Sequence, residues 1–326
     1  MPSFTRRAAA AASLASLALL GGCAGGPSVA APPTADPVAE TIDNCGTPVV
    51  VPAESPSRIV TVKSSAFELL LALGVGDRIV GTAFLDGPVP AAYEAEAAEV
   101  PVLSEKAPSQ EAVLDLEPDL VYAGWESVFS ADGAGERADL ERLGVTTYVA
   151  AAACREPEYR PDPLTFDQVF AEFDEVARLL GQPGLADSLI DEQRTQLTEL
   201  LPNGEGLRAV WYSSGRDQPY VGAGIGAPEM IMAQAGLTNV FADVDDSWTS
   251  TSWEEVADRD PDVIVLVDST WNSADEKIQL LKDNPVTSTL DAVRADRFVV
   301  VDFAATEAGI RNVEAVASII DQLDDR

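Results

Sequence analysis

One segment of this 326-residue chain occurs twice in similar form. Residues 110–125 read QEAVLDLEPDLVYAGW, and residues 253–268 read WEEVADRDPDVIVLVD. Both copies follow the pattern x-Glu-x-Val-x-Asp-x-x-Pro-Asp and continue into an apolar run, so Glu111 and Glu254 each stand seven residues before the proline. Each copy predicts a short helix, a turn and a strand. A unit that recurs in both halves of a chain indicates two similar lobes.

Strand and helix patterns alternate along the chain, which supports α/β lobes. Strands are expected at residues 58–62, 77–81, 120–122, 145–149, 207–212, 263–267 and 297–301. Helices are expected between them, at residues 66–73, 110–114, 139–143, 228–234 and 253–256. Such alternation predicts two Rossmann-like lobes whose parallel sheets are covered on both faces, with a ligand cleft between the lobes.

A helical connection is expected between the lobes. Apolar residues recur at helical spacing through 166–180, residues 181–184 (GQPG) interrupt the pattern, and 185–201 continue it. We therefore expect a long, rigid inter-lobe helix.

The amino terminus has the layout of a secretory signal. A basic pair, Arg6 and Arg7, precedes the uncharged and mostly apolar residues 8–20. That run is too short to remain as a membrane-spanning helix, which needs about 20 residues. The sequence Leu-Gly-Gly-Cys that ends at Cys23 resembles the lipobox of bacterial lipoproteins, which implies that Cys23 is lipidated after cleavage. The alternative is a plain secretory signal in which Cys23 has no role, and the export route, Sec or twin-arginine, stays open.

These features give an expected domain organisation. A diacylated cysteine followed by a tether would hold the protein outside the cytoplasm, anchored to the cell membrane. The expected parts are a signal peptide (1–22), the lipidated cysteine with a flexible tether (23–44), an amino-terminal lobe (45–165), a helical connector (166–206) and a carboxy-terminal lobe (207–326).

Two further cysteines remain, Cys45 and Cys154. Outside the cytoplasm an even pair favours a disulfide. Two separate buried thiols are the alternative.

Charge and composition exclude several function classes. The chain has 54 acidic and 21 basic side chains, a formal net charge of -33, and no histidine. Such a surface repels nucleic acids. Without histidine there is no Ser-His-Asp triad, no Cys-His pair and no imidazole metal site. An extracytoplasmic hydrolase that uses paired carboxylates stays open, although no spacing singles out one pair, and so does an adhesion or sensor protein. We expect no catalysis and no cofactor.

From Arg58 to Gln322 the chain resembles the substrate-binding lipoproteins of ABC importers of the cobalamin and iron-siderophore (Fe/B12 periplasmic-binding, class III) type. The motifs that carry the resemblance are RIVTVKSSAFELLLALGVGDRIVG at 58–81, EAVLDLEPDLVYAG at 111–124, the inter-lobe helix, and WEEVADRDPDVIVL at 253–266. The resemblance implies a monomer that captures a small molecule and delivers it to ABC permease subunits, which work with a cytoplasmic ATPase. It also implies that Glu111 and Glu254 dock the two lobes on the permease. The alternative is that both are ordinary first-turn acids that complement the helix dipole.

Three segments resemble a narrower subgroup, proposed to carry the deazaflavin coenzyme precursor F420-0. They are AGWESVFSADGAG at 123–135, YSSGRDQPYVGAGIGAP at 212–228 and VDSTWNSADEK at 267–277. The implied ligand is F420-0, and a ferric siderophore or cobalamin is the alternative.

Candidate ligand contacts follow from the position of the strands. In open α/β sheets, ligands bind beyond the carboxyl ends of the strands. Aromatic faces there would stack on a planar ligand, and cations would bind its anionic end. The candidates are Lys63, Ser64, Ser65, Phe84, Trp125, Tyr212, Arg216, Trp248, Trp271 and Arg311. The ordinary alternatives are packing for each tryptophan, a helix start for Arg311 and an exposed position for Lys63.

Residues 221–228 are rich in glycine. They either let the backbone approach a ligand at the start of the following helix or form a turn, and both alternatives stay open. The acidic residues 243–246 lack the calcium-loop pattern, so a solvated turn is expected there.

Overall fold

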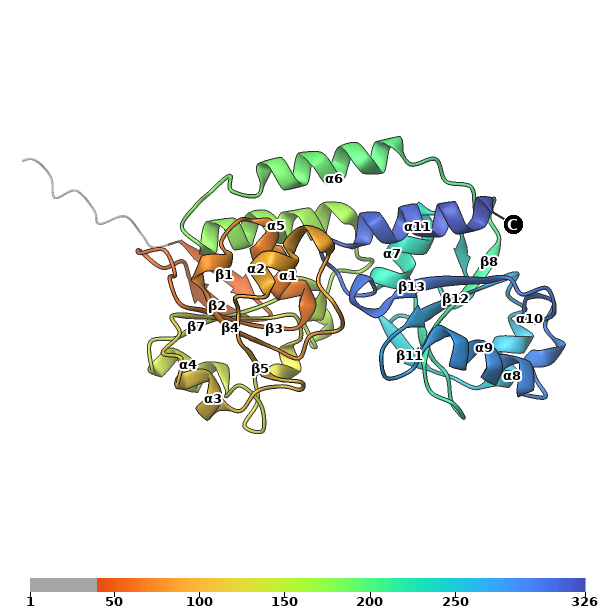
Figure 1. Cartoon of the computed structure of the whole chain (residues 1–326), viewed down its shortest axis with the longest axis horizontal. Helices are drawn as coiled ribbons and strands as arrows, with labels where there is room; N and C mark the ends of the chain where they lie inside the picture. Colours follow the sequence, from red (N-terminus) through yellow and green to blue (C-terminus); the bar gives the residue numbers. More distant parts are fainter. Residues whose placement is uncertain (1–39, 326) are drawn as a thin grey trace, which may run out of the picture. The chain divides into compact units, whose positions relative to one another are not determined.

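The computed structural model describes residues 40–325, which fold into two α/β lobes (Figure 1). The first lobe contains a five-stranded sheet with the order β5-β4-β3-β6-β7, in which every pairing is parallel. Its strands are β3 (Ile59–Val62), β4 (Ile79–Ala83), β5 (Val102–Ser104), β6 (Leu120–Ala123) and β7 (Thr146–Val149). The central strands β3 and β6 are buried at every position, as expected for apolar strands covered on both faces.

Short helices and a hairpin complete the first lobe. The helices are α1 (Ser64–Ala72), α2 (Glu94–Ala97), α3 (Gln110–Leu114) and α4 (Arg137–Arg142). The hairpin of β1 (Thr41–Asn44) and β2 (Thr47–Val50) precedes the sheet and has no counterpart among the expected elements. Asn44 fastens this hairpin to β7, since its side chain exchanges two hydrogen bonds of 2.8 Å with the backbone of Val149.

The second lobe contains a mixed sheet with the order β11-β9-β8-β12-β13. Its strands are β8 (Arg208–Ser214), β9 (Tyr220–Gly222), β10 (Thr238–Asn239), β11 (Trp248–Ser250), β12 (Val263–Asp268) and β13 (Phe298–Asp302), and its helices are α7 (Ala227–Gln234), α8 (Trp253–Asp258), α9 (Ala274–Asp283), α10 (Asp291–Arg294) and α11 (Asn312–Asp324).

Only part of this sheet is parallel, so the expectation of a purely parallel second sheet is wrong. Strand β12 runs parallel to β8 and β13, whereas β9 is antiparallel to both β8 and β11. The reason is the short link between β8 and β9, residues 215–219. A link of this length joins antiparallel strands, because a parallel crossover needs a dozen residues or more.

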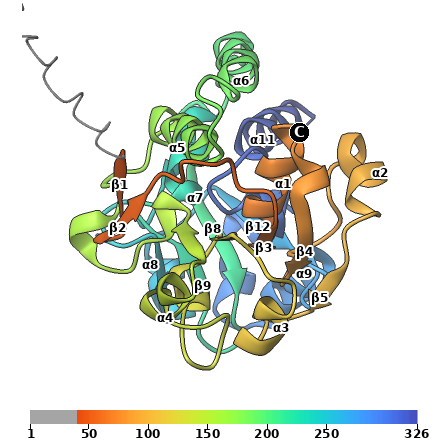
Figure 2. The same ribbon diagram turned by 90° about the vertical axis from the view of Figure 1, so that its left-hand side faces the viewer.

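The helical connection consists of two helices, α5 (Phe166–Leu179) and α6 (Asp187–Glu199). Gly181 and Gly184 have φ values of 70° and 83°, a left-handed conformation that glycine adopts without strain, and the chain turns back there. Figures 1 and 2 show α6 lying along the outer side of α5. The expected long helix is therefore an antiparallel pair, and the chain passes from α6 into β8.

Helix α5 packs on the first lobe through a buried polar contact. The Glu172 carboxylate accepts hydrogen bonds from the Tyr122 hydroxyl at 2.7 Å and from the Ala151 backbone N–H at 2.9 Å. Burial raises the pKa of Glu172 from 4.5 to about 7, although both hydrogen bonds oppose that change.

The repeated segment forms the same strand anchor in both lobes. The Asp119 carboxylate accepts hydrogen bonds from the backbone N–H groups of Ser57 and Arg58, at 2.8 and 3.0 Å, where the chain enters β3. In the second lobe, the Asp262 carboxylate accepts from the Arg208 N–H at 2.9 Å, where the chain enters β8. The aspartate of each Pro-Asp pair therefore fixes the start of a central strand.

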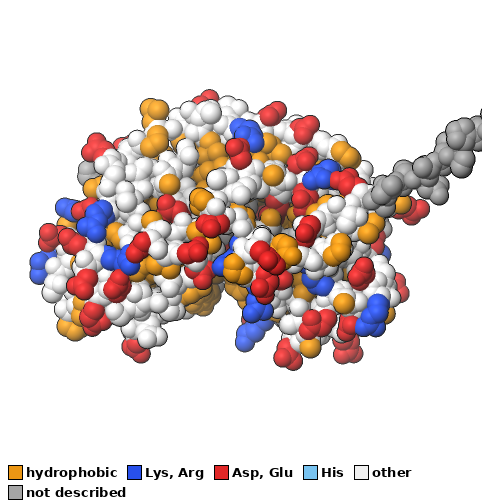
Figure 3. Space-filling view, turned by 180° about the vertical axis from the view of Figure 1, so that it is seen from behind, with side chains coloured by type: hydrophobic (Ala, Val, Ile, Leu, Met, Phe, Trp, Pro, Cys, Tyr) orange, Lys and Arg blue, Asp and Glu red, His pale blue; other side chains and the backbone are white. Residues whose placement is uncertain are grey.

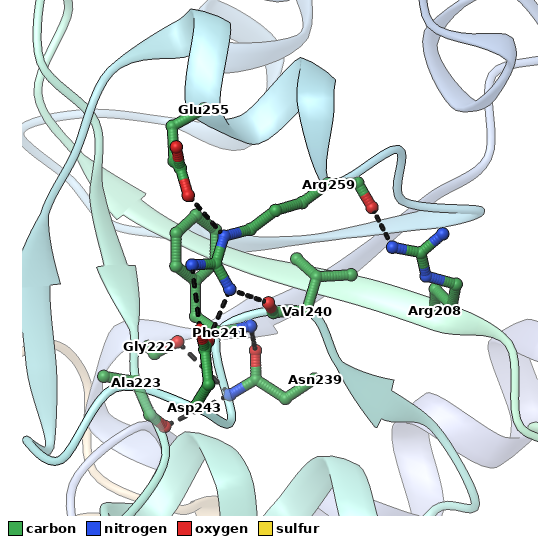
Figure 4. Close-up of polar contacts among 9 residues, drawn as sticks. All are labelled: Arg208, Gly222, Ala223, Asn239, Val240, Phe241, Asp243, Glu255 and Arg259. Atoms are coloured by element: carbon green, nitrogen blue, oxygen red, sulfur yellow. Dashed lines mark hydrogen bonds and ion pairs between the residues drawn. The ribbon is translucent and has the colours of Figure 1, made fainter.

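The arginine side chains at these strand entries also match. Arg58 donates to the Leu116 and Glu117 carbonyls after α3, and Arg208 donates to the Arg259 carbonyl after α8 (Figure 4). The residue before each proline has a positive φ, 46° at Glu117 and 43° at Asp260. The sequence repeat is thus a structural repeat.

We expect Asp119→Ala to lower the free energy of unfolding by about 1–2 kcal/mol, because it removes the acceptor of two backbone N–H groups and of the Ser57 hydroxyl. Urea titration would measure the loss. Asp115→Ala is the matched control, since Asp115 is exposed at the end of α3, four residues earlier in the same repeat. Equal stabilities of the two variants would contradict the anchoring role.

Stability should also depend on pH through Glu172. Because its folded pKa lies above its ordinary value, the folded state retains a proton that the unfolded chain loses between about pH 4.5 and pH 7. The free energy of unfolding should therefore fall over this range by up to about 3 kcal/mol relative to Glu172→Gln, which cannot titrate. Glu175→Gln, which makes the same carboxylate-to-amide change at the acceptor of the Tyr148 hydroxyl, is the control. Parallel pH profiles for the wild type and Glu172→Gln would contradict the assignment.

Candidate ligand-binding cleft

A cleft of about 660 Å³ lies between the two lobes, which is within the range of small-molecule sites. Residues from both lobes line it. Its walls include the end of β6, the end of β8, the turn after β12 and the chain after β13. The cleft therefore occupies the place where ligands bind in open α/β sheets.

Five aromatic side chains line the cleft walls. Tyr220 and Trp248 stack nearly parallel, with ring centroids 5.6 Å apart, and Trp271 meets Phe303 edge to face at 5.8 Å. Trp271 is 61% exposed, so a large apolar surface is available at the rim. Of the expected contacts, the structure brings Ser65, Trp125, Trp248 and Trp271 to the cleft.

Three expected contacts from the first lobe do not line the cleft and instead form a layer beside Trp125. Lys63 is fully buried in an ion pair with Asp86, and the Ser64 hydroxyl accepts a hydrogen bond from the Asp86 N–H at 2.8 Å. The Phe84 ring contacts Trp125 edge to face at 5.3 Å. These side chains support Trp125 rather than face a ligand.

The expected contacts Tyr212 and Arg216 also lie elsewhere. The Tyr212 hydroxyl donates to the Gly215 carbonyl at 2.8 Å, and burial raises its pKa to about 12. Arg216 is exposed outside the cleft, and its carbonyl accepts the Trp253 indole N–H at 2.7 Å.

Arg311 joins the two lobes instead of lining the cleft. Its guanidinium binds the Glu68 carboxylate on α1, with an Nε–Oε2 distance of 2.7 Å, and also donates to the Pro88 carbonyl. Since Arg311 directly precedes α11, this contact fastens the start of that helix to the first lobe.

The cleft's cations are two arginines that the sequence did not single out, Arg155 and Arg160. Both lie in residues 150–164, here named the cleft strap, which follows β7 and contains only two short 3₁₀ turns. Ligand contacts are expected after the carboxyl end of β7, as after the other strands. The strap is irregular, however, so the sequence shows no pattern that tells which of its residues face the cleft. Glu307 also lines the cleft and was not among the expected contacts. It follows β13, next to Thr306, which lines the cleft as well.

Contacts at both ends hold the cleft strap. A disulfide joins Cys154 to Cys45 in the link between β1 and β2. On the second lobe, the Leu164 N–H donates to the Ile225 carbonyl at 2.9 Å, and Arg160 pairs with Asp246 at 2.8 Å.

The glycine-rich segment packs against its own lobe. A Cβ on Gly224 would lie 2.3 Å from the Ala242 carbonyl oxygen, so only glycine fits there. The Asn239 amide donates to the Gly222 and Ala223 carbonyls (Figure 4). The segment then enters the cleft at Ile225, Gly226 and Ala227.

The acidic residues 243–246 are tied by arginines rather than simply solvated. Asp243 pairs with Arg259, which also pairs with Glu255 (Figure 4), and Asp246 pairs with Arg160. Among residues 40–325, no group of three or more potential ligands is arranged to hold a metal ion.

Both glutamates of the repeat are exposed, and each is the second residue of its helix. Ser109 and Ser252 cap α3 and α8, with their hydroxyl oxygens accepting from the N–H groups of Ala112 and Glu255. Figure 1 shows both helices at the side of their lobes that faces away from α5 and α6. On the face of the described residues that Figure 3 shows, acidic side chains are spread over both lobes.

The expected lipidation site, Cys23, lies outside the described residues. Within residues 40–325, none of the helices has both the length and the apolar character required to cross a bilayer.

Comparisons with known proteins agree with this architecture. A vitamin B12-binding protein of Yersinia pestis is 26% identical over 221 residues, which cover 67% of this chain and 72% of the relative. A periplasmic binding protein from Veillonella parvula superposes with a TM-score of 0.75 at 25% identity, covering 89% of this chain and 98% of that one. An ABC-type Fe3+-hydroxamate transport protein from Saccharomonospora viridis gives 0.73 at 26% identity, with 87% and 99% covered. The family model for periplasmic binding proteins matches residues 59–305, and the chain belongs to that family.

Proposed function

We propose that this chain is the extracytoplasmic substrate-binding protein of an ABC importer and that it captures a planar, anionic small molecule. The observation that carries the proposal is the inter-lobe cleft, which combines tryptophan and tyrosine faces with two arginines. Aromatic faces stack on planar groups, and arginine binds carboxylate or phosphate through paired N–H donors. Family membership supports the transport role, in which the ligand is released unchanged.

The finer proposal for the ligand is F420-0, a planar deazaflavin with a phospholactyl tail. The resemblance of three segments to that subgroup motivates it, and Arg155 of the cleft strap is suited to the anionic tail, whereas Arg160 already pairs with Asp246. The relatives favour a second candidate, a ferric siderophore or cobalamin, since two of them are named for vitamin B12 and Fe3+-hydroxamate. A monomeric lipoprotein anchored through Cys23 completes the proposal, because such an anchor would keep the cleft near its permease.

Thermal unfolding of the mature chain should identify the ligand class. F420-0, a ferric hydroxamate and cyanocobalamin would be added separately. A compound present at a hundredfold its dissociation constant should stabilise the fold by about 2.7 kcal/mol. We expect this response with F420-0. Stabilisation by the ferric hydroxamate or cyanocobalamin alone would replace F420-0 by the second candidate, and no response to all three would contradict the ligand proposal.

The stacking role has a matched control. Trp271→Ala should weaken F420-0 binding about two- to tenfold, because one exposed aromatic face is lost at the cleft rim. Tyr93→Ala removes a half-buried aromatic residue of the first lobe outside the cleft and should leave the affinity unchanged.

Docking on the permease is tested by Glu111→Ala combined with Glu254→Ala. We expect uptake into cells to be lost while the affinity for the ligand stays the same, since both side chains are exposed and do not line the cleft. Each contact is weak alone, but two together fix the orientation of the complex. The control combines Asp115→Ala with Asp258→Ala, which removes the same charge from the same two helices. Normal uptake by the glutamate double variant would refute the docking role.

A further inference from the structure

Glu307 is a carboxylate in the cleft wall with a rigid backbone position. It lies between the 3₁₀ turn at Phe303–Ala305 and helix α11. The fully buried Asn312 amide donates to the Glu307 carbonyl at 2.7 Å and to the Ala305 carbonyl at 3.1 Å, and its oxygen accepts from the Gly309 N–H at 2.8 Å. Hydrogen bonds from the buried Asn312 side chain therefore fix the backbone of the turn that carries Glu307.

The charges around Glu307 leave its own charge uncompensated. Lys63 and Asp86 face it from the first lobe, and Tyr220 faces it from β9. Lys63 and Asp86 form a buried ion pair with each other, at 0% and 2% side-chain exposure. The three ionisable groups Lys63, Asp86 and Glu307 therefore sum to one negative charge. Burial raises the pKa of Glu307, while Lys63 and a side-chain hydrogen bond with Trp125 act in the opposite direction.

Trp125 separates this buried charge pair from the cleft. The Lys63 Nζ lies 3.7 Å from the centroid of the Trp125 ring, close enough for a cation–π interaction. Lys63 does not line the cleft, whereas Trp125 does, so the indole covers the ammonium group. Lys63 has a φ of 81° and a ψ of 151°, a conformation that costs a non-glycine residue energy and that often marks functional sites.

We propose that the Glu307 carboxylate accepts a hydrogen bond from an N–H or O–H donor on the edge of the planar ligand group, beside Trp125. This inference deepens the proposed function and rests on it. A donor would give the carboxylate a further hydrogen bond beside the one with Trp125, whereas an anionic edge would be repelled and an edge with acceptors alone would give it none. The anionic end of the same ligand would face Arg155, whose side chain has no hydrogen bond or ion pair with any residue between 40 and 325.

The assignment makes Glu307 a specificity-determining residue. A site built to accept a ligand N–H rejects an analogue without it far more strongly than an apolar pocket rejects a change of size. The imide N–H of a deazaflavin ring is such a donor, so the test uses F420-0 and its derivative methylated at the imide nitrogen.

Calorimetric titration of the full mature chain with both compounds tests the inference. The wild type should bind F420-0 at least about tenfold more tightly than the methylated derivative. Glu307→Ala should weaken F420-0 binding by a similar factor and bring the ratio of the two affinities close to one. Glu314→Ala is the matched control, since Glu314 is exposed on α11 outside the cleft, and it should keep the wild-type ratio.

The pH dependence of binding gives a second readout that a purely structural role would not change. Protonation of Glu307 removes the acceptor, so the affinity for F420-0 should fall as the pH is lowered through the raised pKa of this group. Glu307→Gln keeps an acceptor oxygen but cannot titrate. Its affinity for F420-0 should therefore fall less than that of the wild type as the pH is lowered.

Each outcome separates this inference from the proposed function. If F420-0 binds but the wild type and Glu307→Ala show the same ratio for the two compounds, the Glu307 assignment is overturned and the ligand proposal stands. If F420-0 does not bind to the wild type, the ligand proposal fails and the assignment fails with it. The comparison of the two compounds on the wild type needs no variant, so a folding defect cannot obscure it.

Discussion

The central strands of both lobes direct their carboxyl ends at one cleft, and this arrangement fixes the positions of several cleft side chains. Trp125 follows β6, Ser213 and Ser214 end β8, Trp271 follows β12, and Glu307 follows β13. The strand entries are fixed by Asp119 and Asp262, at the opposite ends of the sheets. Because hydrogen bonds hold the strands in register along their length, fixing the entries also fixes the groups at the exits.

The lobes are joined by more than chain connections. Arg311 binds Glu68 from across the gap, Arg160 binds Asp246, and the backbone of the cleft strap hydrogen bonds to the second lobe. The antiparallel pair α5 and α6 adds a helical layer along the same side (Figure 1). Two ion pairs and a backbone hydrogen bond thus link the lobes in addition to the chain itself.

Much of the fold could be predicted from the sequence, because helix and strand periodicity are local properties. The two-lobe α/β architecture is confirmed, and the repeated segments form matching anchors. The strands β9 and β11 were not predicted because each has only three residues, too few to show a period. The reversal between α5 and α6 depends on two glycines, which the pattern marked as a break without showing that the second helix folds back beside the first.

The cations of the site could not be predicted from their rarity alone. In a chain with 54 acidic side chains, several arginines and lysines pair with carboxylates that are distant in sequence. Lys63 pairs with Asp86, and Arg311 pairs with Glu68, which lies 243 positions away. Position after a strand identified Trp125 and Trp271 in the cleft, but it also selected Phe84 and Tyr212, which pack elsewhere. Which cations face the cleft depends on tertiary pairing, and only the folded structure shows it.

The bridge between Cys45 and Cys154 also changes the covalent topology of the chain. It closes a ring of 109 sequence positions that contains the whole five-stranded sheet and ends beside the arginines of the cleft strap. Once it is closed, a single proteolytic cut in an exposed loop of the first lobe leaves both fragments linked, and the cleft keeps its wall.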